Sequence, residues 1–596
     1  MKRLLERFLL PYRGRIALGV CFKLVEVVFD ILNPLVVAYM IDRGVAERDV
    51  GVVMRCGLLL VLFAAVGWSF TMVCQRMAAV VSQGTGTDLR RALYEKVNEL
   101  SAEDVDRFGT PSLVTRVTND VNQIQVAVAL GIRQLVRFPL IAVGAMVSAL
   151  LIDWHLGVVF LVCTPAIGLV FYLVMSRSVP YFRVMQQKLD KVSLVTREAL
   201  SGVRVIRAFG REQGEKDRFA EAASDQAATA IDVGRLSSVL NPATFLVMNL
   251  GIVCILWAGG IRVDAGELSQ GQVMAFVNYM MQTLTSVAYI ANLVVIFTRA
   301  TASGQRIMEV LDCEPKVRDD ASARLDLPEA ATAPRALAGE KDGAPRAASV
   351  PAISLEGVGF SYEGAKAPAL SGVTLELGRG QTLGVIGGTG SGKSTLALLL
   401  ARLYDPTEGT VRLLGHDVAS YPFDQLREVV SIVPQQASLV SGTIRSNLSW
   451  RKGVATDEEL WDALEAAQAA DFVRAKPAGL DEVVEAGGRN FSGGQRQRLT
   501  IARALVGDPR ICILDDSSSA LDFKTDARLR HALRERAGSM TSVVISQRVS
   551  SVMHADLICV LDHGRMAGLG THEELLGGCE LYREIVESQL GAKEVA

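Results

Sequence analysis

The sequence predicts an α-helical transmembrane domain, with six membrane helices and long cytoplasmic extensions, fused to an α/β domain. Half of the 596 residues are hydrophobic although 21% are charged, so apolar and charged residues are expected to segregate into different parts of the chain. Six long apolar stretches precede residue 305. After residue 353, short β-rich runs alternate with helical patterns, which is typical of an α/β domain with a largely parallel sheet.

Each apolar stretch reaches the roughly 20 residues that a membrane helix needs. The long connections at 81–133 and 177–240 are rich in Arg and Lys. The short connections at 42–56, 153–155 and 263–270 carry few positive charges. By the positive-inside rule, the long connections and both termini are cytoplasmic. The predicted spans are about 16–41, 57–80, 134–152, 156–176, 241–262 and 271–298.

The segments that flank the spans complete the predicted organisation. Apolar residues at positions 4, 5, 8 and 9 lie opposite charged residues at 2, 3, 6 and 7. This pattern predicts a short amphipathic helix on the membrane surface. An Ala-, Pro- and Glu-rich run predicts a flexible linker. The expected domains are therefore a transmembrane domain at 1–312, a linker at 313–351 and an α/β domain at 352–596, which the motifs below identify as a nucleotide-binding domain.

A glycine-rich loop is the strongest local motif. It follows the strand pattern at 383–386 and opens a helix near Ser394. Its backbone N–H groups can face phosphate oxygens at the positive end of that helix. Lys393 is expected to reach the β- and γ-phosphates, and the Ser394 hydroxyl to ligate Mg²⁺. The loop residues are Gly387, Gly388, Thr389, Gly390, Ser391, Gly392, Lys393, Ser394 and Thr395.

Two acidic residues end a later apolar strand. Asp515 and Asp516 follow the run at 511–514. A carboxylate at the tip of a buried strand beside a phosphate loop can hold Mg²⁺ through water. Alone, two such acids would often be a helix cap, but together with the phosphate loop they indicate a catalytic site.

The segment Phe491-Ser492-Gly493-Gly494-Gln495 lies between these motifs and resembles the signature of ATP-binding cassette (ABC) proteins, Leu-Ser-Gly-Gly-Gln. Phe491 replaces the leucine, and Ser492, Gly493, Gly494 and Gln495 stand unchanged. Ser492, the glycines and the start of the next helix form a second anion cradle. In the family, this cradle closes over the γ-phosphate bound to the opposite subunit.

The other family positions follow in order. The resemblance implies that Tyr362 stacks on adenine, and that Gln435 contacts Mg²⁺ and senses the membrane domain. The run Ser519-Ala520-Leu521-Asp522 matches a loop that crosses the dimer interface. The implied ligands are ATP and Mg²⁺, with Ser394, Gln435 and Asp515 around the metal.

Two positions depart from the family pattern. The residue after Asp515 is normally a glutamate that polarises the attacking water, and here it is Asp516. The switch position after the strand at 543–545 is normally histidine, and here it is Gln547. Asp516 is one methylene shorter, and an amide cannot carry a proton as imidazole does. The pattern resembles the degenerate-site subunit of heterodimeric exporters.

The resemblance extends more loosely into the membrane half. Phe108-Gly109-Thr110-Pro111 and the run at 116–121 resemble the first cytoplasmic loop of the exporter-type fold, and the run at 198–209 resembles the second. In that fold, two short coupling helices from these loops touch the nucleotide domains, one of them the partner's. Fusion of the two domains in one chain also favours the exporter fold.

Polar residues within the spans allow two interpretations. Lys23, Glu26 and Asp30 fall on one helical face. They either line a cavity for cationic amphiphiles, or Lys23 pairs with Glu26 while Asp30 bonds to a neighbouring helix. Polar residues of the last span are further cavity candidates or interhelical contacts. These are Asn278, Tyr279, Gln282, Tyr289 and Asn292.

These features together predict half of a heterodimeric exporter of a hydrophobic or amphipathic small molecule, drug or lipid, in a bacterial-type inner membrane. The partner would be a different half-transporter with an intact catalytic glutamate, and the ATPase would be fully active only with it. Three further functions fit the sequence less well: a homodimeric exporter with slow hydrolysis, an exporter-fold importer, for example of siderophores, and an ATP-gated regulatory or channel-like protein. The net charge of −2 gives no basic field for nucleic acid.

Overall fold

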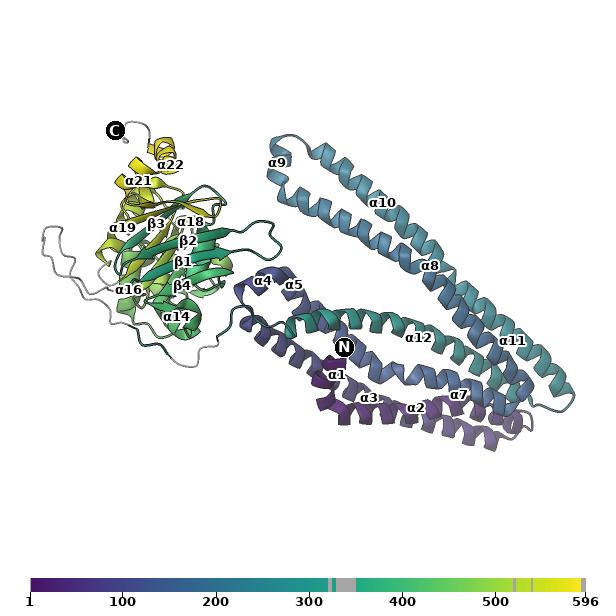
Figure 1. Cartoon of the computed structure of the whole chain (residues 1–596). Helices are drawn as coiled ribbons and strands as arrows, with labels where there is room; N and C mark the ends of the chain where they lie inside the picture. Colours follow the sequence, from purple (N-terminus) through teal and green to yellow (C-terminus); the bar gives the residue numbers. More distant parts are fainter. Residues whose placement is uncertain (1, 320–323, 328–349, 518–520, 537–539, 591–596) are drawn as a thin grey trace. The chain divides into compact units, whose positions relative to one another are not determined.

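The computed structural model describes residues 2–319, 324–327, 350–517, 521–536 and 540–590. The chain forms two units, which are considered separately below (Figure 1). The helical unit comprises Met1–Asn98 and Gly109–Cys313, and the α/β unit comprises Glu99–Phe108 and Glu314–Ala596. Residues 99–108, expected within the transmembrane domain, therefore belong to the α/β unit.

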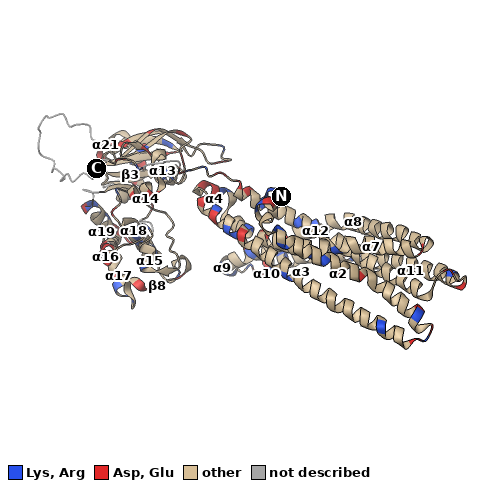
Figure 2. Ribbon diagram, turned by 90° about the horizontal axis from the view of Figure 1, so that it is seen from below, with Lys and Arg blue, Asp and Glu red and all other residues tan. Residues whose placement is uncertain are grey.

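The described part of the helical unit contains six helical segments long and apolar enough to cross a membrane, in the order that hydropathy predicts. Figure 2 shows long stretches of these helices without charged residues. Each segment extends beyond its apolar stretch, and the excess at 81–99, 110–133, 177–201 and 212–240 lies in the two connections for which a cytoplasmic location is predicted. The six segments are Leu10–Val45, Val50–Glu99, Thr110–Ile152, Trp154–Ser201, Glu212–Asp264 and Gln270–Leu311.

A short helix, α1 (Lys2–Phe8), precedes the first span. Its Leu4 and Phe8 side chains are buried, whereas Arg3, Glu6 and Arg7 are exposed. This one-sided burial is the arrangement expected of an amphipathic helix at a membrane surface.

The remaining helices of this unit pack through small and aromatic side chains. Ala145 and Ala149 pack in one buried cluster with Phe160, Phe276 and Tyr279, and small residues allow such close helix approach. The main helices are α2 (Arg13–Tyr39), α3 (Val50–Glu99), α5 (Thr110–Thr115), α6 (Val121–Leu130), α7 (Arg137–Ile152), α8 (Trp154–Ser201), α9 (Val203–Ala208), α10 (Glu212–Ser238), α11 (Leu240–Asp264) and α12 (Gln270–Leu311).

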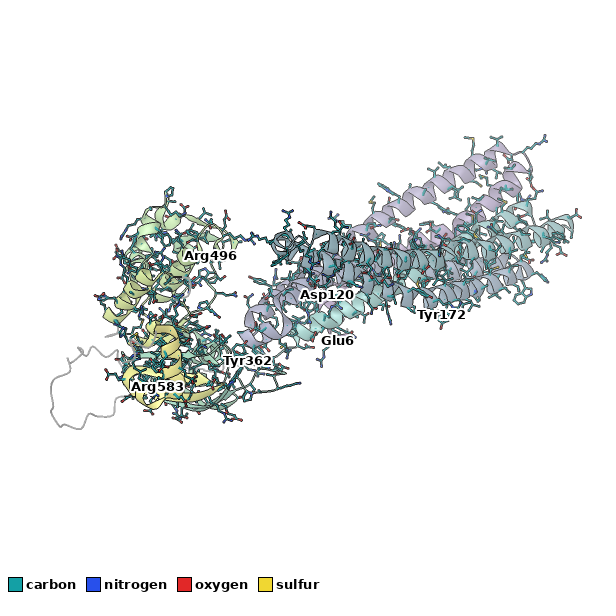
Figure 3. The ribbon with its side chains drawn as sticks, turned by 90° about the horizontal axis from the view of Figure 1, so that it is seen from above. Glu6, Asp120, Tyr172, Tyr362, Arg496 and Arg583 are labelled. Atoms are coloured by element: carbon teal, nitrogen blue, oxygen red, sulfur yellow. The ribbon has the colours of Figure 1, made fainter. Side chains whose placement is uncertain are left out.

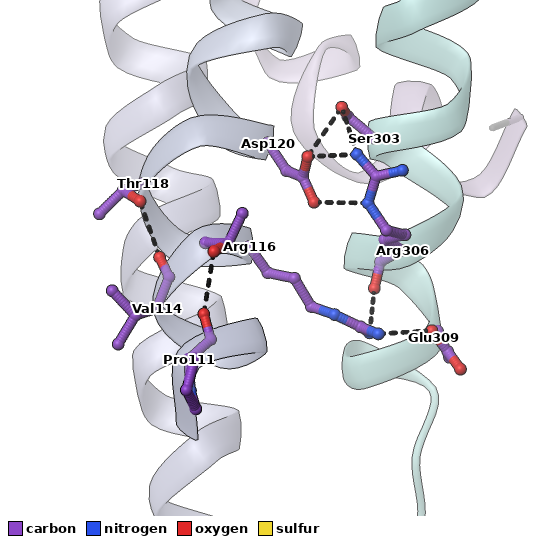
Figure 4. Close-up of polar contacts among 9 residues, drawn as sticks. Pro111, Val114, Arg116, Thr118, Asp120, Ser303, Arg306 and Glu309 are labelled. Carbon is purple, nitrogen blue, oxygen red and sulfur yellow. Dashed lines mark hydrogen bonds and ion pairs between the residues drawn. The ribbon is translucent and has the colours of Figure 1, made fainter. Parts of the chain in front are cut away.

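An ion pair between a buried aspartate and a half-exposed arginine joins the segment before α6 to α12 (Figure 4). Asp120 is fully buried at the end of a π-helical turn, η3 (Arg116–Asp120). Its carboxylate accepts hydrogen bonds from Arg306 Nε at 2.8 Å, Arg306 Nη2 at 2.5 Å and the Ser303 hydroxyl at 2.9 Å. Arg116 donates to the Arg306 carbonyl oxygen at 2.7 Å and pairs with Glu309 at 2.8 Å. These contacts fix α5, η3 and α6 against the end of α12.

Two main sheets form the framework of the α/β unit. One is a four-stranded antiparallel sheet in the order β2-β1-β4-β5, and the other is a six-stranded sheet in the order β12-β11-β3-β10-β9-β6. Their strands are β1 (Ile353–Phe360), β2 (Leu370–Leu377), β3 (Thr382–Gly387), β4 (Glu408–Leu413), β5 (His416–Asp417), β6 (Val430–Val433), β9 (Ile511–Asp515), β10 (Thr541–Ile545), β11 (Leu557–Asp562) and β12 (Arg565–Gly570).

Five strands of the larger sheet run parallel, and their register sets the position of the site. Ile545 of β10 is paired with Val385 of β3 on one side and with Asp515 of β9 on the other. The carboxyl ends of β3, β9 and β10 therefore meet at one edge of the sheet, where ligands bind in open α/β folds. The alternating β-rich and helical sequence pattern predicted this largely parallel arrangement.

A helical region extends the α/β unit around a second apolar core. The core includes Leu460, Leu464, Phe491, Leu499 and Ile501. Leu460 and Leu464 belong to α16 (Asp457–Ala466), and Leu499 and Ile501 belong to α18 (Gly493–Leu505). Phe491, which replaces the usual leucine of the signature, is buried here at 3% exposure.

The helix α4 (Ala102–Phe108) belongs to the α/β unit, although helical-unit segments precede and follow it in the chain. Tyr404 donates its hydroxyl proton to Asp106 at 2.5 Å. Lys316 pairs with Glu103 at 2.6 Å and with Glu363 at 2.8 Å. The burial of Tyr404 and its bond to Asp106 raise the pKa of the phenol.

The predicted linker, 313–351, is described only at 313–319, 324–327 and 350–351. Leu325 exchanges two backbone hydrogen bonds with the Gln425 amide, both at 2.8 Å. Leu325 and Leu327 also pack against the core of the α/β unit. The described part of this segment is thus anchored on the α/β unit, and the rest lies outside the described residues.

The ion pair of the buried Asp120 gives a stability prediction. Asp120→Asn should lower the melting temperature of the full chain, because it removes the charge of a buried carboxylate that accepts three hydrogen bonds. Since Arg306 is half-exposed, the expected cost is about 1.5–3 kcal/mol, the range for hydrogen bonds to a charged group. The matched control is Asp225→Asn, which breaks the exposed pair with Lys188 and should cost under about 1 kcal/mol. Thermal unfolding in lipid nanodiscs measures both, and equal shifts for the two variants would contradict the structural role of Asp120.

Candidate functional site

A cavity of about 360 Å³ opens at the carboxyl edge of the parallel sheet. Its walls come from the loop after β3, the ends of β9 and β10, and single residues from elsewhere in the α/β unit. The predicted site residues in this lining are Tyr362, Thr389, Gly390, Ser391, Gly392, Lys393, Ser394, Thr395, Gln435, Asp515, Asp516 and Gln547.

The glycine-rich loop curls between β3 and α13 (Lys393–Leu400). Gly390 and Gly392 have φ angles of 81° and 97°, a region that L side chains rarely adopt. A Cβ on Gly392 would lie 2.6 Å from the Ala369 carbonyl oxygen and from the Leu370 side chain. The loop therefore needs glycine at position 392 for both conformation and space, and it forms a backbone cradle at the start of a helix.

The Lys393 side chain lies inside this backbone cradle. Its ammonium donates to the carbonyl oxygens of Gly387 at 2.9 Å and Gly388 at 2.5 Å, and to the Ser391 hydroxyl at 3.2 Å. Burial lowers the pKa of the ammonium, while the charges of Asp515 and Asp516 oppose this shift. A cation held over backbone carbonyls at a helix start suits a polyphosphate ligand.

Ser394 and Asp515 form the second polar group of the site. The Ser394 hydroxyl donates to Asp515 Oδ1 at 3.2 Å. Asp515 is 8% exposed at the tip of β9, and burial raises the pKa of its carboxyl. A hydroxyl beside a carboxylate is the oxygen-donor set that Mg²⁺ prefers, so these residues fit the metal predicted here.

Asp516 follows at the mouth of the cavity. Its φ angle is 43°, in the left-handed region, and its backbone N–H donates to the Ile545 carbonyl oxygen at 2.9 Å. The Gln435 amide nitrogen lies 3.5 Å from its carboxylate. Burial raises the pKa of Asp516. A second carboxylate thus lies in the cavity where the family has glutamate.

Gln547 is exposed on the loop between β10 and α20 (Val549–Val552) and lines the same cavity. The preceding Ser546 is buried, with its N–H bonded to the Val385 carbonyl oxygen at 3.1 Å. The structure therefore brings Asp516 and Gln547, the two departures from the family pattern, to one cavity.

Tyr362 stands at the side of the cavity with an exposure of 36%. Its hydroxyl shares a hydrogen bond of 3.0 Å with Thr395, and its ring packs edge-on against Phe360 and Tyr404. The ring is thus held by three neighbours beside the phosphate loop. Its predicted stacking on adenine stays a prediction.

The signature residues do not line this cavity. Ser492 is the N-cap of α18 and forms a capping box with Gln495: the Ser492 N–H donates to Gln495 Oε1 at 3.0 Å, and the Gln495 N–H to Ser492 Oγ at 3.3 Å. Figure 3 shows Arg496, next to the signature, well apart from Tyr362. Ser492 and Gly493 are exposed, so this helix start is accessible to another molecule.

Asp522, from the predicted interface loop, is the N-cap of α19 (Phe523–Glu535). Its carboxylate accepts bonds from the Thr525 N–H at 3.0 Å and the Thr525 hydroxyl at 2.8 Å. These bonds lower the pKa of Asp522. Ser519 and Ala520 of the same loop lie outside the described residues.

The charged residues of the first span are paired within the helical unit. Lys23 and Glu26 are buried and lie 2.6 Å apart. Asp30 pairs with Arg137 at 3.0 Å, and Arg137 also approaches Glu26 at 3.9 Å. These contacts match the interpretation in which Lys23 pairs with Glu26 and Asp30 bonds to a neighbouring helix. The partner of Asp30 on that helix is Arg137. A role for Glu26 and Asp30 in a substrate cavity stays a prediction.

Polar residues of α12 mainly contact helix backbones. The Gln282 amide donates to the Asp30 carbonyl oxygen at 3.3 Å, and the buried Tyr279 hydroxyl donates to the Ile31 carbonyl oxygen at 2.7 Å. Asn278 bonds to its own helix at the Met274 carbonyl oxygen. The remaining two candidates differ: Tyr289 stacks on Phe138 at 4.2 Å, and Asn292 is exposed.

Sequence reasoning missed Arg137 and the residues of α4. The hydrogen bond from Tyr404 to Asp106 joins residues 298 positions apart, and that from Arg137 to Asp30 joins residues 107 apart. No local pattern indicates such pairs. An arginine inside the predicted span at 134–152 was the signal available for Arg137, because an intramembrane charge needs a partner.

The loop geometry makes a specific prediction. Gly392→Ala should lower the melting temperature of the nucleotide-free chain, since the left-handed backbone alone costs about 1–2 kcal/mol and the added Cβ meets the Ala369 carbonyl oxygen. The control is Gly388→Ala, where φ is not in the strained range and no atom lies within 4 Å of the added Cβ. Equal melting temperatures for both variants would contradict this account of the loop.

Comparison with known proteins agrees with this geometry. Residues 16–287 match the family model of the ABC transporter transmembrane region, and residues 370–519 match that of the ABC transporter domain. An uncharacterized ABC transporter ATP-binding protein of Mycobacterium tuberculosis is 37% identical over 589 residues, which cover 98% of each chain.

Two relatives with more specific names match at lower identity. The ATP-dependent lipid A-core flippase of Chromobacterium violaceum is 31% identical over 558 residues, covering 94% of this chain and 91% of the flippase. A multidrug efflux ATP-binding/permease protein of Mycobacterium tuberculosis is 30% identical over 582 residues, covering 98% of this chain but 47% of that protein. The chain belongs to the ABC transporter family and joins an exporter-type membrane region to an ATP-binding domain.

Proposed function

We propose that this chain is one half of a heterodimeric ABC exporter, with an ATP site that binds nucleotide but hydrolyses it slowly. The observation that carries the proposal is the composition of one cavity. Lys393, Ser394 and Asp515 are present for binding, whereas Asp516 and Gln547 stand where the family has glutamate and histidine. The binding groups are therefore kept, and the two groups that activate water are altered.

The position of Asp516 supports slow hydrolysis. Aspartate is one methylene shorter than glutamate, which withdraws its carboxylate by about 1.5 Å. The backbone cannot readily move to compensate, because the Asp516 N–H is bonded to Ile545. A displacement of about 1 Å from the attacking water can cost on the order of 100-fold in rate.

Gln547 limits the chemistry in another way. Its amide can donate a hydrogen bond to a γ-phosphate oxygen, but it cannot take up and release a proton as imidazole does. Together with Asp516, it leaves a site that can recognise the terminal phosphate without activating water efficiently.

The remaining residues of the cavity would hold ATP in place. The loop amides and Lys393 bind the phosphates, and Tyr362 supports the adenine. Ser394, Asp515 and Gln435 would hold Mg²⁺, which when bound neutralises charge on the phosphate oxygens. Retained ATP would act mainly as a clamp between the two nucleotide-binding domains.

The signature would serve the partner. Ser492 begins α18 away from this chain's own cavity and is exposed. A helix start with serine and two glycines is an anion site, so Ser492, Gly493, Gly494 and Gln495 would complete the partner's hydrolytic site. The partner would be a different half-transporter that retains its catalytic glutamate.

Two short helices would couple ATP binding to the membrane helices. The first is α4, held to the α/β unit by Asp106 and Tyr404. The second is α9, where Val205 and the next residue after the helix, Phe209, are 61% and 75% exposed. Exposed apolar side chains at a helix turn suit docking on another protein, and in this proposal they meet the partner's nucleotide-binding domain.

We further propose a hydrophobic or amphipathic substrate and a bacterial-type inner membrane, with both termini in the cytoplasm. Relatives named as a lipid A-core flippase and as a multidrug efflux protein support this substrate class. Glu26, Asp30, Asn278 and Gln282 are the candidate substrate contacts. The six spans return the chain to the side on which it starts, where ATP is available.

The test is ATP hydrolysis by this chain alone and with the half-transporter encoded beside it, both in nanodiscs. We expect slow hydrolysis alone and about 100-fold faster hydrolysis together, since only the partner's site would activate water well. Replacing the partner's catalytic glutamate should abolish turnover, whereas Asp516→Ala should leave much of it.

Fast hydrolysis by this chain alone would contradict the heterodimer and favour a homodimeric exporter. Uptake assays in sealed inverted vesicles distinguish an exporter from an importer and from a protein that does not transport. ATP-dependent accumulation supports export, depletion indicates an importer, and no ATP-dependent transport indicates a regulatory or channel-like protein.

A further inference from the structure

The C-terminal helix α22 (Glu580–Leu590) contacts the loop that carries Gln547. The Gln589 amide nitrogen donates to the Gln547 carbonyl oxygen at 2.7 Å. The Gln589 amide oxygen accepts from the Val549 N–H at 2.8 Å. One side chain thus bonds to the backbone on both sides of Arg548. We propose that Gln589 is a positioning residue of the ATP site, which fixes the loop so that Gln547 faces the cavity.

The loop needs such support because of where it lies. It leaves β10 at Ile545, and its exposed residue Gln547 lines the cavity. Ser546 is fixed on the upstream side by Val385, and its hydroxyl accepts from the Arg548 N–H at 3.0 Å. Gln589 fixes the downstream side of the loop through its hydrogen bonds to Gln547 and Val549.

Apolar packing holds α22, the helix that carries Gln589. Tyr582 and Val586 of α22 are buried in one cluster with Val549 and Val552 of α20. Gln589 lies three residues after Val586, so it falls on the same helical face. The Tyr582 hydroxyl also lies 2.7 Å from His572 Nδ1. The amide of Gln589 is therefore directed at the loop by a fixed helix.

The chemistry requires an amide of this length. The side-chain amide offers a donor and an acceptor on separate atoms, so it bonds to both backbone groups at once. Glutamate would lose the donor and set a carboxylate oxygen against the Gln547 carbonyl oxygen. Methionine would keep the length but lose both hydrogen bonds.

This inference rests on the proposed role of Gln547 as a contact to the γ-phosphate. If that role holds, Gln589 controls recognition of ATP as opposed to ADP from outside the cavity. Loss of its bonds should then affect the terminal phosphate alone, since the phosphate loop and Tyr362 lie elsewhere in the site.

Two measurements on the full chain in nanodiscs test the inference. The variants are Gln589→Met and Gln589→Glu, with Ser588→Ala as the control on the same helix. Hydrogen exchange without nucleotide should be about 5-fold faster at the Val549 amide in Gln589→Met, the effect of losing one net hydrogen bond. It should be unchanged in Ser588→Ala.

The second measurement is the affinity for Mg-ATP and Mg-ADP. Gln589→Met should bind ATP about 5-fold more weakly with ADP affinity unchanged, and Gln589→Glu should show at least that loss. Gln547→Ala should show the same selective loss of ATP affinity. Combining it with Gln589→Met should weaken ATP binding little further, because both substitutions act through one loop.

The outcomes separate the two proposals. Two results would overturn the role of Gln589 alone. One is unchanged hydrogen exchange at the Val549 amide in Gln589→Met. The other is normal ATP affinity in Gln589→Met together with a selective loss of ATP affinity in Gln547→Ala. If Gln547→Ala discriminates ATP from ADP normally, the role of Gln547 is wrong, and the role of Gln589 falls with it. Equal losses of ATP and ADP affinity in Gln589→Met would indicate general damage to the site and would also overturn the inference.

Discussion

The parallel register of β3, β10 and β9 determines where the phosphate loop, Asp515, Asp516 and Gln547 lie. Val385, Ile545 and Asp515 are paired side by side, so the next residues of each strand emerge at one edge. The phosphate loop continues from β3, Asp516 follows β9, and Gln547 lies two residues after β10. Backbone hydrogen bonds across the edge then fix the loops, including those from Asp516 to Ile545 and from Ser546 to Val385.

This constraint explains why two substitutions can alter the site without dismantling it. Asp516 and Gln547 project from ends that the sheet already fixes, whereas Lys393 is held by the carbonyl oxygens of its own loop. In the proposed function, binding and water activation therefore depend on different residues of one cavity. A partner that has an intact catalytic glutamate, and whose ATP site is completed by the signature of another chain, would complement this chain.

Much of the fold and the site was predictable from the sequence because the signals are local. Membrane spans depend on composition over about 20 residues, and the phosphate loop needs only a strand, glycines and a helix start in succession. The Lys23–Glu26 pair was visible for the same reason, as its members lie one helical turn apart. Contacts between distant segments gave no such signal. The bond from Tyr404 to Asp106, the pair of Arg137 with Asp30, and the bonds of Gln589 to Gln547 and Val549 depend on tertiary packing.

The central claim is that this chain's site holds ATP without readily hydrolysing it, and the identity of the retained nucleotide tests it most directly. The purified chain in nanodiscs is incubated with Mg-ATP, freed of unbound nucleotide and denatured, and the released nucleotide is separated by chromatography. The account predicts that ATP is recovered, with Lys393→Ala as the control that retains none. Recovery of ADP in place of ATP would contradict it, because it would show that Asp516 and Gln547 support hydrolysis.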